Sequence, residues 1–575
     1  MRKHVRDNGS RLPVIVKARP GHELRLSQRM KHRKLRLGRK LGDGRQLALL
    51  NGDEMAMLEA DGLIERISYD APVRSMALPD ATTAQAASVL RAAVAAPSAY
   101  RGTGVGVGII DSGIAPIEGL VERITAFYDF TTGVPLATMP VDGYGHGTHV
   151  AGIVGGLLHD DTTGIAPGVH FIGLRVLDST GGGVTSNVIQ ALDFAVANRA
   201  ALGIDVLNLS LGRPVYESAA TDPLVLAVER AVRAGIVVVV SAGNVGKNPQ
   251  TGVVGYGGIT SPGNSPSAIT VGASTAADTA TRLDDRVSDF SSRGPTWYDG
   301  AAKPDIVAPG AGIVSARAPL SVLDTYTALQ VVKLGGTYLR LSGTSMAAPV
   351  AAGVAALMIE ASRAACPVAG TCPPISPKTV KAVMQYTATP LKDAYGLDYN
   401  PLVQGRGEVN AAAAVSVAAS IDTRMSVGQP WLTTSLAGQT TVGLETWAWS
   451  NGIIWGNTVL EGDLLLSNQS AWDDTIVWGT STDLDTIVWG TSLEFDTIVW
   501  GTSVDTIVWG TNVVWDDTIV WGTTIVWGTS IVGTSDGDTI VWGTTDFDSD
   551  TIVWGTTDFD TIVWGTSVGV VSTMY

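Results

Sequence analysis

The stretch Val105-Gly-Val-Gly-Ile-Ile-Asp111 decides how this 575-residue chain folds, because it reads as a buried β-strand that ends on a carboxylate. Similar short runs rich in Val and Ile recur along the chain, and Ala-rich helical stretches lie between them. This alternation predicts a parallel sheet with helices on both faces. Asp111 then lies at the carboxyl end of its strand, the edge where such sheets bind ligands. The fold class is therefore α/β, a three-layer domain with a mostly parallel central sheet.

The alternating pattern extends over residues 102–420. We expect strands at residues 105–110, 171–176, 206–211, 236–240 and 269–271, and helices at residues 187–199 and 223–234. The glycine run at residues 102–108 imitates a dinucleotide-binding loop. Its glycines lie before and inside the strand instead of after it, which excludes a dinucleotide site.

Three short segments contain the candidate catalytic residues of this domain. They are Asp111-Ser-Gly113, His146-Gly-Thr-His-Val-Ala-Gly152 and Gly343-Thr-Ser345-Met-Ala-Ala-Pro349. Each alone has an ordinary structural explanation, such as a Ser or Asp that caps a helix. Together they follow one of the few orders in which a serine-nucleophile triad is arranged along a chain. We expect Ser345 as nucleophile, His146 as general base and acid, and Asp111 as the group that orients the imidazole.

The surroundings of these residues suit that chemistry. Gly145 and Gly147 flank His146 and allow the backbone to pack closely. Ser345 opens a helix expected at residues 345–361, whose N-terminal N–H groups and positive dipole end favour a developing oxyanion. His146 and His149 could instead form a zinc pair, but the segment lacks the Glu of the zinc-protease helix motif.

With these motifs, residues 102–420 resemble the subtilisin-like serine peptidases, or subtilases. Supporting segments are Gly164-Ile-Ala-Pro167, Asn208-Leu-Ser-Leu-Gly212, Ser241-Ala-Gly-Asn244, Phe290-Ser-Ser-Arg-Gly-Pro295 and Lys303-Pro-Asp-Ile-Val-Ala-Pro-Gly310. The resemblance implies an endopeptidase that hydrolyses peptide bonds in proteins through an acyl-enzyme on Ser345, with no cofactor for the chemistry. It also implies that Asn244, after Gly243, completes the oxyanion hole with the Ser345 N–H, and that Ser210-Leu211-Gly212 pairs with an extended substrate.

Residues 1–76 are expected to form a separate, basic α+β domain. Residues 1–80 contain 17 Lys and Arg against 10 Asp and Glu, without the interleaved aromatic residues that would suit nucleic acid. We expect strands at residues 14–17, 46–50 and 63–69, and helices at residues 22–40 and 53–60, the second with Asp53 as N-cap. The family resemblance implies an inhibitor-type propeptide that binds its own peptidase domain and is removed between about residues 70 and 80, followed by a connector at 77–101.

A linker at 421–470 and an acidic repeat tail at 471–575 are expected to complete the chain. Residues 425–575 contain 19 Asp and Glu and no Lys, Arg or His. Asp-Thr-Ile-Val-Trp-Gly-Thr occurs eight times, and a ninth copy at Trp527 lacks the Asp. Its alternation predicts a strand with a turn at the Gly. A spacer, a stacked β array for surface attachment or self-association, and a binder of polymer or glycan remain open as roles.

Location, metals and thiols are less constrained. No apolar run approaches the roughly 18 residues of a membrane span, and no secretory signal is visible at the N-terminus. Cys366 and Cys372 allow either a small disulfide or two free thiols. Asp160 and Asp161 could ligate a structural calcium, although their loop is shorter than the calcium loop of several relatives. The metal content is otherwise unknown from the sequence.

We expect a secreted or cell-surface bacterial enzyme that is made as a self-processed proenzyme. One alternative is an intracellular processing enzyme. The other is a surface structural or adhesion protein in which the repeat tail is the functional part and the peptidase domain serves only maturation.

Overall fold

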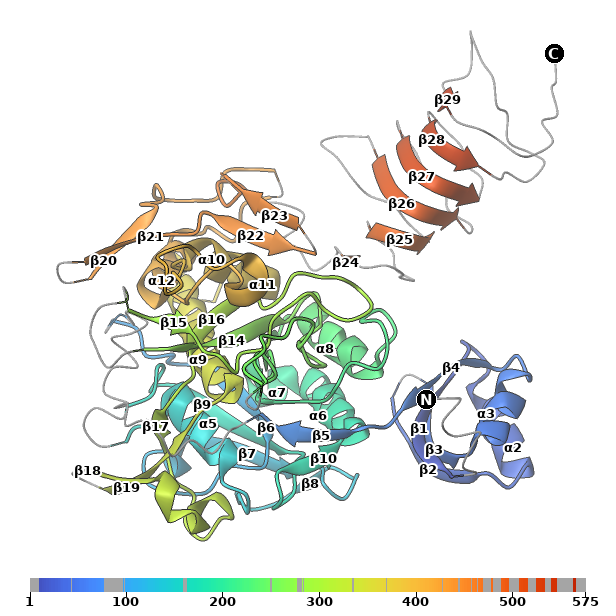
Figure 1. Cartoon of the computed structure of the whole chain (residues 1–575), viewed down its shortest axis with the longest axis horizontal. Coiled ribbons are helices and arrows are strands. Elements are labelled where there is room, and N and C mark those ends of the chain that lie inside the picture. The colour runs from blue at the N-terminus through green and yellow to red at the C-terminus, as the bar shows by residue number, and fades with distance from the viewer. Residues whose placement is uncertain are drawn as a thin grey trace. The chain divides into compact units, whose positions relative to one another are not determined.

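The structure of the chain is a computed structural model (Figure 1). It describes residues 10–76 and 97–468, with gaps at residues 43, 98, 159–162, 249–250, 277–281, 283, 334–335, 369, 427, 443–444, 457 and 463, and the backbone of six strands beyond. Met1–Arg424 with Leu432–Leu464 form one compact unit, and Met425–Trp431 with Leu465–Tyr575 form a second.

A mostly parallel sheet forms the centre of the first unit (Figure 1). In spatial order its strands are β15 (Arg286–Val287), β14 (Ile269–Thr275), β13 (Val237–Ser241), β11 (Ile204–Leu209), β6 (Gly106–Asp111), β9 (His170–Arg175), β7 (Ile124–Asp129) and β8 (Leu136–Ala137), and β16 (Ile306–Pro309) also pairs with β14. Only β8 and β15 run antiparallel to their neighbours among these described strands. The expected α/β class is confirmed, and all five predicted strands are present.

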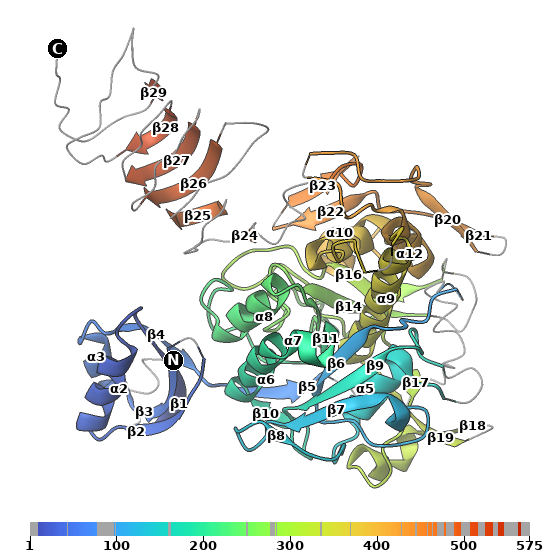
Figure 2. The same ribbon diagram turned by 180° about the vertical axis from the view of Figure 1, so that it is seen from behind.

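Helices cover both faces of this sheet (Figure 2). α5 (His146–Gly155) and α9 (Thr344–Ala364) pack against each other on one face, and α6 (Thr185–Ala197), α7 (Arg199–Leu202) and α8 (Pro223–Arg233) cover the other. Small residues let α9 approach its neighbours: a Cβ on Gly353 would lie only 2.6 Å from Ile165 Cβ. Within the described residues, α9 is the one helix long and apolar enough to cross a membrane, but 94% of its apolar window is buried inside the fold. It is the core helix of the domain.

Smaller elements complete this domain. The β17-β19-β18 sheet consists of β17 (Ile313–Ser315), β19 (Gly336–Leu341) and β18 (Gln330–Lys333); the 3-10 turns are η2 (Val121–Arg123), η4 (Leu323–Thr325) and η5 (Thr327–Leu329); and the last helices are α10 (Pro377–Thr387), α11 (Pro401–Gln404) and α12 (Ala411–Ser420). Cys366 and Cys372 form a disulfide, which decides between the two states that the sequence left open.

A small α+β domain precedes the large one. Its antiparallel sheet has the order β2 (Arg36–Lys40), β3 (Arg45–Leu50), β1 (Leu12–Ala18) and β4 (Ile64–Tyr69), and its helices are α2 (Glu23–His32) and α3 (Gly52–Glu59). The helices and one sheet face share an apolar core that includes Val14, Val16, Met30, Leu50 and Leu58.

Two predictions for this domain are wrong. The helix expected at residues 22–40 ends at His32, and residues 36–40 form β2. Leu35 and Leu37, two residues apart, both pack on the apolar core, which is the spacing of one strand face and not of a helix. The N-cap of α3 is Asn51 instead of Asp53. Asn51 and Glu54 form a reciprocal capping box that satisfies two backbone N–H groups at once.

The segment expected to be a linker at 421–470 is partly folded. β20 (Gln439–Val442) with β21 (Glu445–Ala448) and β22 (Gly452–Trp455) with β23 (Thr458–Glu461) form two hairpins that contact α12 and α10. Trp447 and Trp449 are buried there, and Ile454 N donates to Gln385 Oε1 at 2.6 Å. The linker prediction is therefore wrong for residues 439–461, which belong to the first unit.

The repeat tail contains a parallel six-stranded sheet (Figure 1). Its strands, in spatial order, are β24 (Val477–Trp478), β25 (Val488–Phe495), β26 (Thr506–Trp515), β27 (Thr524–Val532), β28 (Thr539–Thr545) and β29 (Ile562–Trp564). Repeat copies pair in register, so that each repeat Trp opposes the next one along the sheet. The repeat glycines Gly490, Gly510, Gly528 and Gly543 lie inside their strands, so the expected turn at Gly is wrong for β25, β26, β27 and β28. The copies at Trp500, Trp521 and Trp554 lie outside the described residues.

Candidate active site

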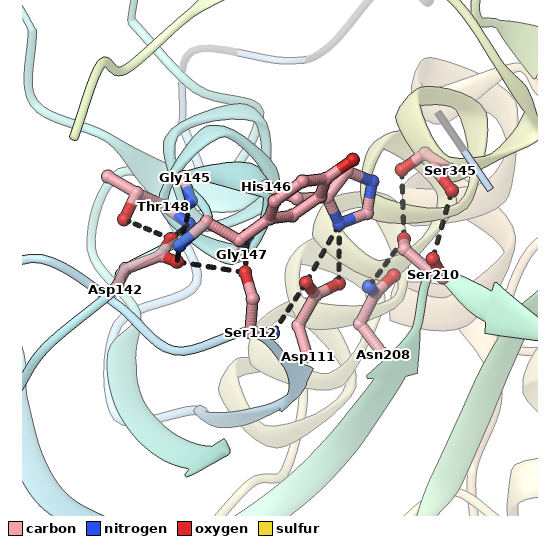
Figure 3. Close-up of polar contacts among 11 residues, drawn as sticks. Asp111, Ser112, Asp142, Gly145, His146, Gly147, Thr148, Asn208, Ser210 and Ser345 are labelled. Atoms are coloured by element: carbon pink, nitrogen blue, oxygen red, sulfur yellow. Dashed lines mark hydrogen bonds and ion pairs between the residues drawn. The ribbon is translucent and has the colours of Figure 1, made fainter. Parts of the chain in front are cut away.

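The carboxylate of Asp111 and the imidazole of His146 form a buried pair (Figure 3). β6 ends on Asp111 at the carboxyl edge of the sheet, and α5 begins at His146 after Gly145, which has a φ of 100° that suits glycine. The two Asp111 oxygens lie 2.8 and 2.9 Å from His146 Nδ1, and both side chains are fully buried. A carboxylate at Nδ1 selects the tautomer with its proton there, which leaves Nε2 as the free base.

Ser345 lies in the first turn of α9, after Gly343 with a φ of 146°. Ser345 Oγ donates to the Ser210 carbonyl at 2.9 Å, and Ser210 Oγ donates to the Ser345 carbonyl at 2.8 Å (Figure 3). Asn208 Nδ2 in turn donates to Ser210 Oγ at 2.9 Å. In the part of the chain that the structure describes, His146 Nε2 has no hydrogen-bond partner. Ser345 Oγ is thus bound to Ser210 and not to His146, whose Nε2 stays available as a base.

A strand from the N-terminal domain occupies the groove beside these residues. β5 (Pro72–Ser75) is the middle strand of an antiparallel sheet between β10 (Gly182–Val184) and β12 (Leu211–Gly212). After β5, Met76 N donates to the Ser210 carbonyl at 3.3 Å. Because that carbonyl also accepts from Ser345 Oγ, Met76 lies beside the hydroxyl. An extended peptide added between two sheet edges is a common mode of peptide recognition.

Asn244 directs its amide at the carbonyl of Met76. Asn244 Nδ2 donates to Met76 O at 2.6 Å, and Asn244 Oδ1 accepts from Thr344 N at 2.9 Å and Thr344 Oγ1 at 3.0 Å. These two bonds fix which end of the amide faces the peptide. Gly243 precedes with a φ of 110°, and a Cβ there would lie 2.8 Å from Ser292 Oγ, so only glycine fits without a shift.

Glycines form the walls that receive the side chains of this peptide. A Cβ on Gly212 would lie 2.8 Å from Met76 Cε and 2.8 Å from Thr260 Oγ1. Val73 is fully buried, and a Cβ on Gly183 would lie 3.3 Å from Val73 Cγ2. Missing side chains at positions 212 and 183 therefore leave the space that Met76 and Val73 fill.

The zinc alternative for His146 and His149 does not fit the structure. His149 Nε2 lies 3.1 Å from the carbonyl of Ile313 and 3.0 Å from that of Leu339, so it faces carbonyl acceptors. Burial lowers the pKa of His149 to about 3, and His149 is therefore neutral. Among the described residues, no group of three or more His, Cys, Asp or Glu side chains could hold a metal. Asp160 and Asp161, the expected calcium ligands, lie outside the described residues.

The structure brings together all the residues that the sequence selected as a site. Asp111 and His146 lie in one site with Ser345 (Figure 3). Asn244 donates to Met76, which shares the Ser210 carbonyl with Ser345, and Ser210, Leu211, Gly212 and Gly243 line the occupied groove. Sequence reasoning missed β10, the second edge of the groove, and Thr344, which orients Asn244. Thr344 directly precedes the nucleophile, and this position is the one feature of the sequence that could have identified it. The segment at 182–184 is too short to show a strand pattern.

Comparisons with known proteins agree with this geometry. The Subtilase family matches residues 102–407. Serine protease AprX of Bacillus subtilis (strain 168) is 38% identical over 341 residues, which are 58% of this chain and 71% of that protein. Subtilisin DY of Bacillus licheniformis is 35% identical over 318 residues, which are 55% of this chain and 92% of that protein.

A solved structure shows the same fold. Fervidolysin from Fervidobacterium pennivorans, described as a keratinolytic enzyme related to subtilisin, aligns with a TM-score of 0.53 and 21% identity. The alignment covers 71% of this chain and 62% of that one. At this identity the likeness concerns the fold alone.

Proposed function

Because this chain belongs to the subtilase family and is a serine endopeptidase that acts on proteins or peptides, we propose that it is made as a proenzyme that cleaves its own bond between Met76 and Ala77. One observation carries the proposal. The Met76 carbonyl oxygen accepts a hydrogen bond from Asn244 Nδ2 at 2.6 Å while Met76 N is bound to the Ser210 carbonyl. Residues 1–76 are then both propeptide and first substrate.

Self-cleavage of the Met76–Ala77 bond proceeds through an acyl-enzyme on Ser345. The Ser345 hydroxyl turns from the Ser210 carbonyl, gives its proton to His146 Nε2 and attacks the Met76 carbonyl carbon. The oxygen becomes an oxyanion beside Asn244 Nδ2 and the N-terminal turn of α9. The C–N bond breaks, and the Ala77 amine leaves with the proton from His146. Water then attacks the Met76–Ser345 ester, with His146 again as base, and Asp111 stabilises the imidazolium in both halves.

The propeptide is held by contacts spread over the peptidase surface. Asp70 accepts from Ser186 N at 2.8 Å and Ser186 Oγ at 2.9 Å, and the Ala71 carbonyl accepts from Thr185 N. These bonds satisfy N–H groups at the start of α6, whose own N-cap residue provides no side-chain cap. Arg39 donates to Asn187 Oδ1 at 2.6 Å on the same helix. The propeptide therefore completes a helix terminus of the enzyme, which supports a role in its folding.

Apolar contacts also bind the propeptide to the peptidase domain. Ile15 on β1 and Val73 on β5 are buried within the same core cluster as residues of α6 and α8, and Leu47 packs against it. Burial of a side chain of this kind stabilises by about 1.5–3 kcal/mol. Because all these contacts lie before Ala77, breaking the Met76–Ala77 bond removes none of them. The cleaved propeptide remains in the groove as an inhibitor until it dissociates or is degraded.

Intact-mass and N-terminal sequence analysis of the freshly folded full chain tests this proposal. We expect a new N-terminus at Ala77 in the wild type and none in Ser345→Ala. Ser241→Ala is a matched control, because Ser241 Oγ is buried on β13 and has no hydrogen-bond partner among the described residues. It should cleave as the wild type does. A different N-terminus, or the same cleavage in Ser345→Ala, would refute the assignment.

We also propose that the enzyme is secreted and that its tail is a stacked β module for surface attachment or self-association. The in-register parallel pairing of the repeat copies supports a stacked array over an extended spacer. A chain that ends at residue 468 keeps the hairpins of the first unit and removes the tail strands. It should retain cleavage at Met76 and lose retention on the cell surface. Unchanged retention would contradict this role of the tail and the tail-centred alternative alike.

A further inference from the structure

Asp142 is a buried carboxylate close to the catalytic histidine in sequence and in space, and the reaction described above gives it no role (Figure 3). Its side chain is 5% exposed. Its oxygens accept five hydrogen bonds, from Ser112 Oγ at 2.9 Å, Tyr144 N at 3.2 Å, Gly145 N at 2.7 Å, Thr148 N at 2.8 Å and Thr148 Oγ1 at 2.7 Å. Tyr144 and Gly145 precede the histidine in the chain, and Thr148 follows it. Asp142 therefore fixes the turn from which the imidazole projects.

Ser112 connects Asp142 to the other half of the catalytic pair. Ser112 Oγ donates to Asp142 and accepts from Gly147 N at 3.0 Å, while Ser112 N donates to Asp111 Oδ1 at 2.7 Å. Asp142 thus contacts the histidine turn directly and the carboxylate of Asp111 through one residue. The network joins the end of β6 to the start of α5, the two elements whose separation sets the geometry of Asp111 and His146.

The charge of Asp142 is not balanced by any of these contacts, because all five donors are neutral. Burial raises the pKa of Asp142, and the bonds from Thr148 and Gly145 oppose that rise by favouring the charged form. Among the described residues, other ionisable groups around the site are Asp111, the neutral His149 and Tyr144. Arg175 of β9 is paired with Asp129, Arg317 of the loop beside Gly145 is paired with Asp324, and Asp178 belongs to the loop that packs against Tyr144. Asp142 is thus a second acidic group near the imidazole.

We propose that Asp142 is a positioning residue for the reaction: through Ser112 and the turn at 144–148 it holds His146 against Asp111, and its negative charge favours the imidazolium that forms during catalysis. The carboxylate itself never contacts the substrate. A purely structural role would require the hydrogen bonds but not the charge. The two roles therefore predict different pH profiles.

The rate of self-cleavage at Met76 in the full chain, measured from pH 5 to pH 9, tests this. This readout rests on the self-cleavage proposed above, and because the substrate is already bound, the rate reports chemistry without KM. For Asp142→Asn we expect a rate about 10–100-fold lower, since small displacements of catalytic groups cost this much. We also expect the acid limb of the pH profile to move to lower pH by about one unit, because a nearby negative charge is lost.

Asp222→Asn is the matched control. Asp222 is also fully buried and accepts from Leu224 N at 2.9 Å, Arg213 at 2.6 Å and Ser261 Oγ at 2.8 Å, but it does not contact the triad segments. It should lower stability and leave the acid limb in place. The proposal is overturned if the rate or the acid limb of Asp142→Asn equals that of Asp222→Asn.

The experiment also covers an Asp142→Asn variant that does not fold and a wild type that does not cleave itself. If Asp142→Asn does not fold, Ser112→Ala decides, because it breaks the connection and keeps the charge. A rate about tenfold lower with the acid limb in place supports the proposal, and a wild-type rate overturns it. If the wild type itself does not cleave, the proposed function fails. The role of Asp142 is then tested with the same variants, and the rate at which a fluorophosphonate probe labels Ser345 replaces the rate of self-cleavage.

Discussion

Replacing Asn244 by Ala removes one donor from the oxyanion site and leaves the triad in place. Asn244 Nδ2 lies 2.6 Å from Met76 O, the oxygen that becomes negative when Ser345 attacks. The amide cannot reverse its orientation easily, because Oδ1 accepts from both the N–H and the hydroxyl of Thr344. The donor is therefore preorganised for the transition state of self-cleavage.

The expected magnitude has two separate parts. Loss of one oxyanion donor typically lowers the rate by about 10²–10³, equivalent to ~2.7–4 kcal/mol of transition-state stabilisation. Loss of Oδ1 leaves two donors of Thr344 without their acceptor, which lowers the free energy of unfolding by about 1–3 kcal/mol per buried group that stays unpaired. The first part appears in the rate of cleavage, and the second appears only in thermal or denaturant unfolding.

The assay is the time course of the Ala77 N-terminus in freshly folded full-length protein, a single turnover without a binding step. Asn244→Asp separates the two parts, because a carboxylate keeps an acceptor for Thr344 but offers no donor to Met76. It should be more stable than Asn244→Ala and no faster. Asn400→Ala is the control: it removes the N-cap of α11, at a cost of about 1 kcal/mol, and should cleave at the wild-type rate.

A rate for Asn244→Ala within about threefold of the wild type would refute the oxyanion assignment, because one preorganised donor contributes far more than that. Wild-type cleavage by Asn244→Asp would do the same. The distance between Asn244 and Met76 would then reflect a contact that holds the propeptide and not one that serves the reaction.

Two further predictions concern the groove and its release. Gly212→Ala places a Cβ 2.8 Å from both Met76 Cε and Thr260 Oγ1, so self-cleavage should slow by about tenfold or more. Met76→Ala in the same chain relieves the first contact and should recover part of the rate; no recovery would show that the contact with Met76 is not what slows cleavage. Burial, with Asp222 nearby, raises the pKa of Glu217 from 4.5 to about 7 where Ser68 of the propeptide donates to it at 3.2 Å. Ser68 and Arg66 of the propeptide oppose this rise, so we attribute the burial of Glu217 to the bound propeptide. The bound state then takes up a proton, and the hold is strongest below about pH 4.5 and weakens as the pH rises to about 7. Glu217→Gln should abolish this dependence, measured as the onset of activity on an added peptide after self-cleavage; an unchanged onset would contradict it.

The catalytic residues were predictable because the chemistry constrains short segments. Asp111 ends a strand, while His146 and Ser345 lie at the starts of helices, and each position needs a particular neighbour, such as the glycines at 145 and 343 with their positive φ values. Such constraints are local, so they are visible in the sequence. The central sheet was predictable for a similar reason: strands buried on both faces are continuous apolar runs.

The occupied groove was not predictable in the same way. β5 has four residues, and its partners β10 and β12 lie more than 100 residues away along the chain. A local pattern of residues does not show which distant strands pair. The helix expected at residues 22–40 failed for a related reason, since residues 36–40 form a strand by pairing with β3, which a local helical pattern does not show. Asp142 was missed because its five donors are mostly backbone groups, which no sequence motif identifies.

The arrangement of contacts around Met76 implies that activation has two steps with different determinants. Cleavage depends on Ser345, His146 and Asn244, and it breaks a bond on the far side of every described propeptide contact. Before cleavage the propeptide is tethered, and its high effective concentration keeps it bound even if its intrinsic affinity is modest. Afterwards the contacts of β5, Asp70, Arg39, Ser68 and the apolar face retain it. Variants that weaken those contacts should therefore hasten the appearance of activity on added substrate without changing the rate at which Ala77 becomes the N-terminus, whereas variants of the triad should lower both.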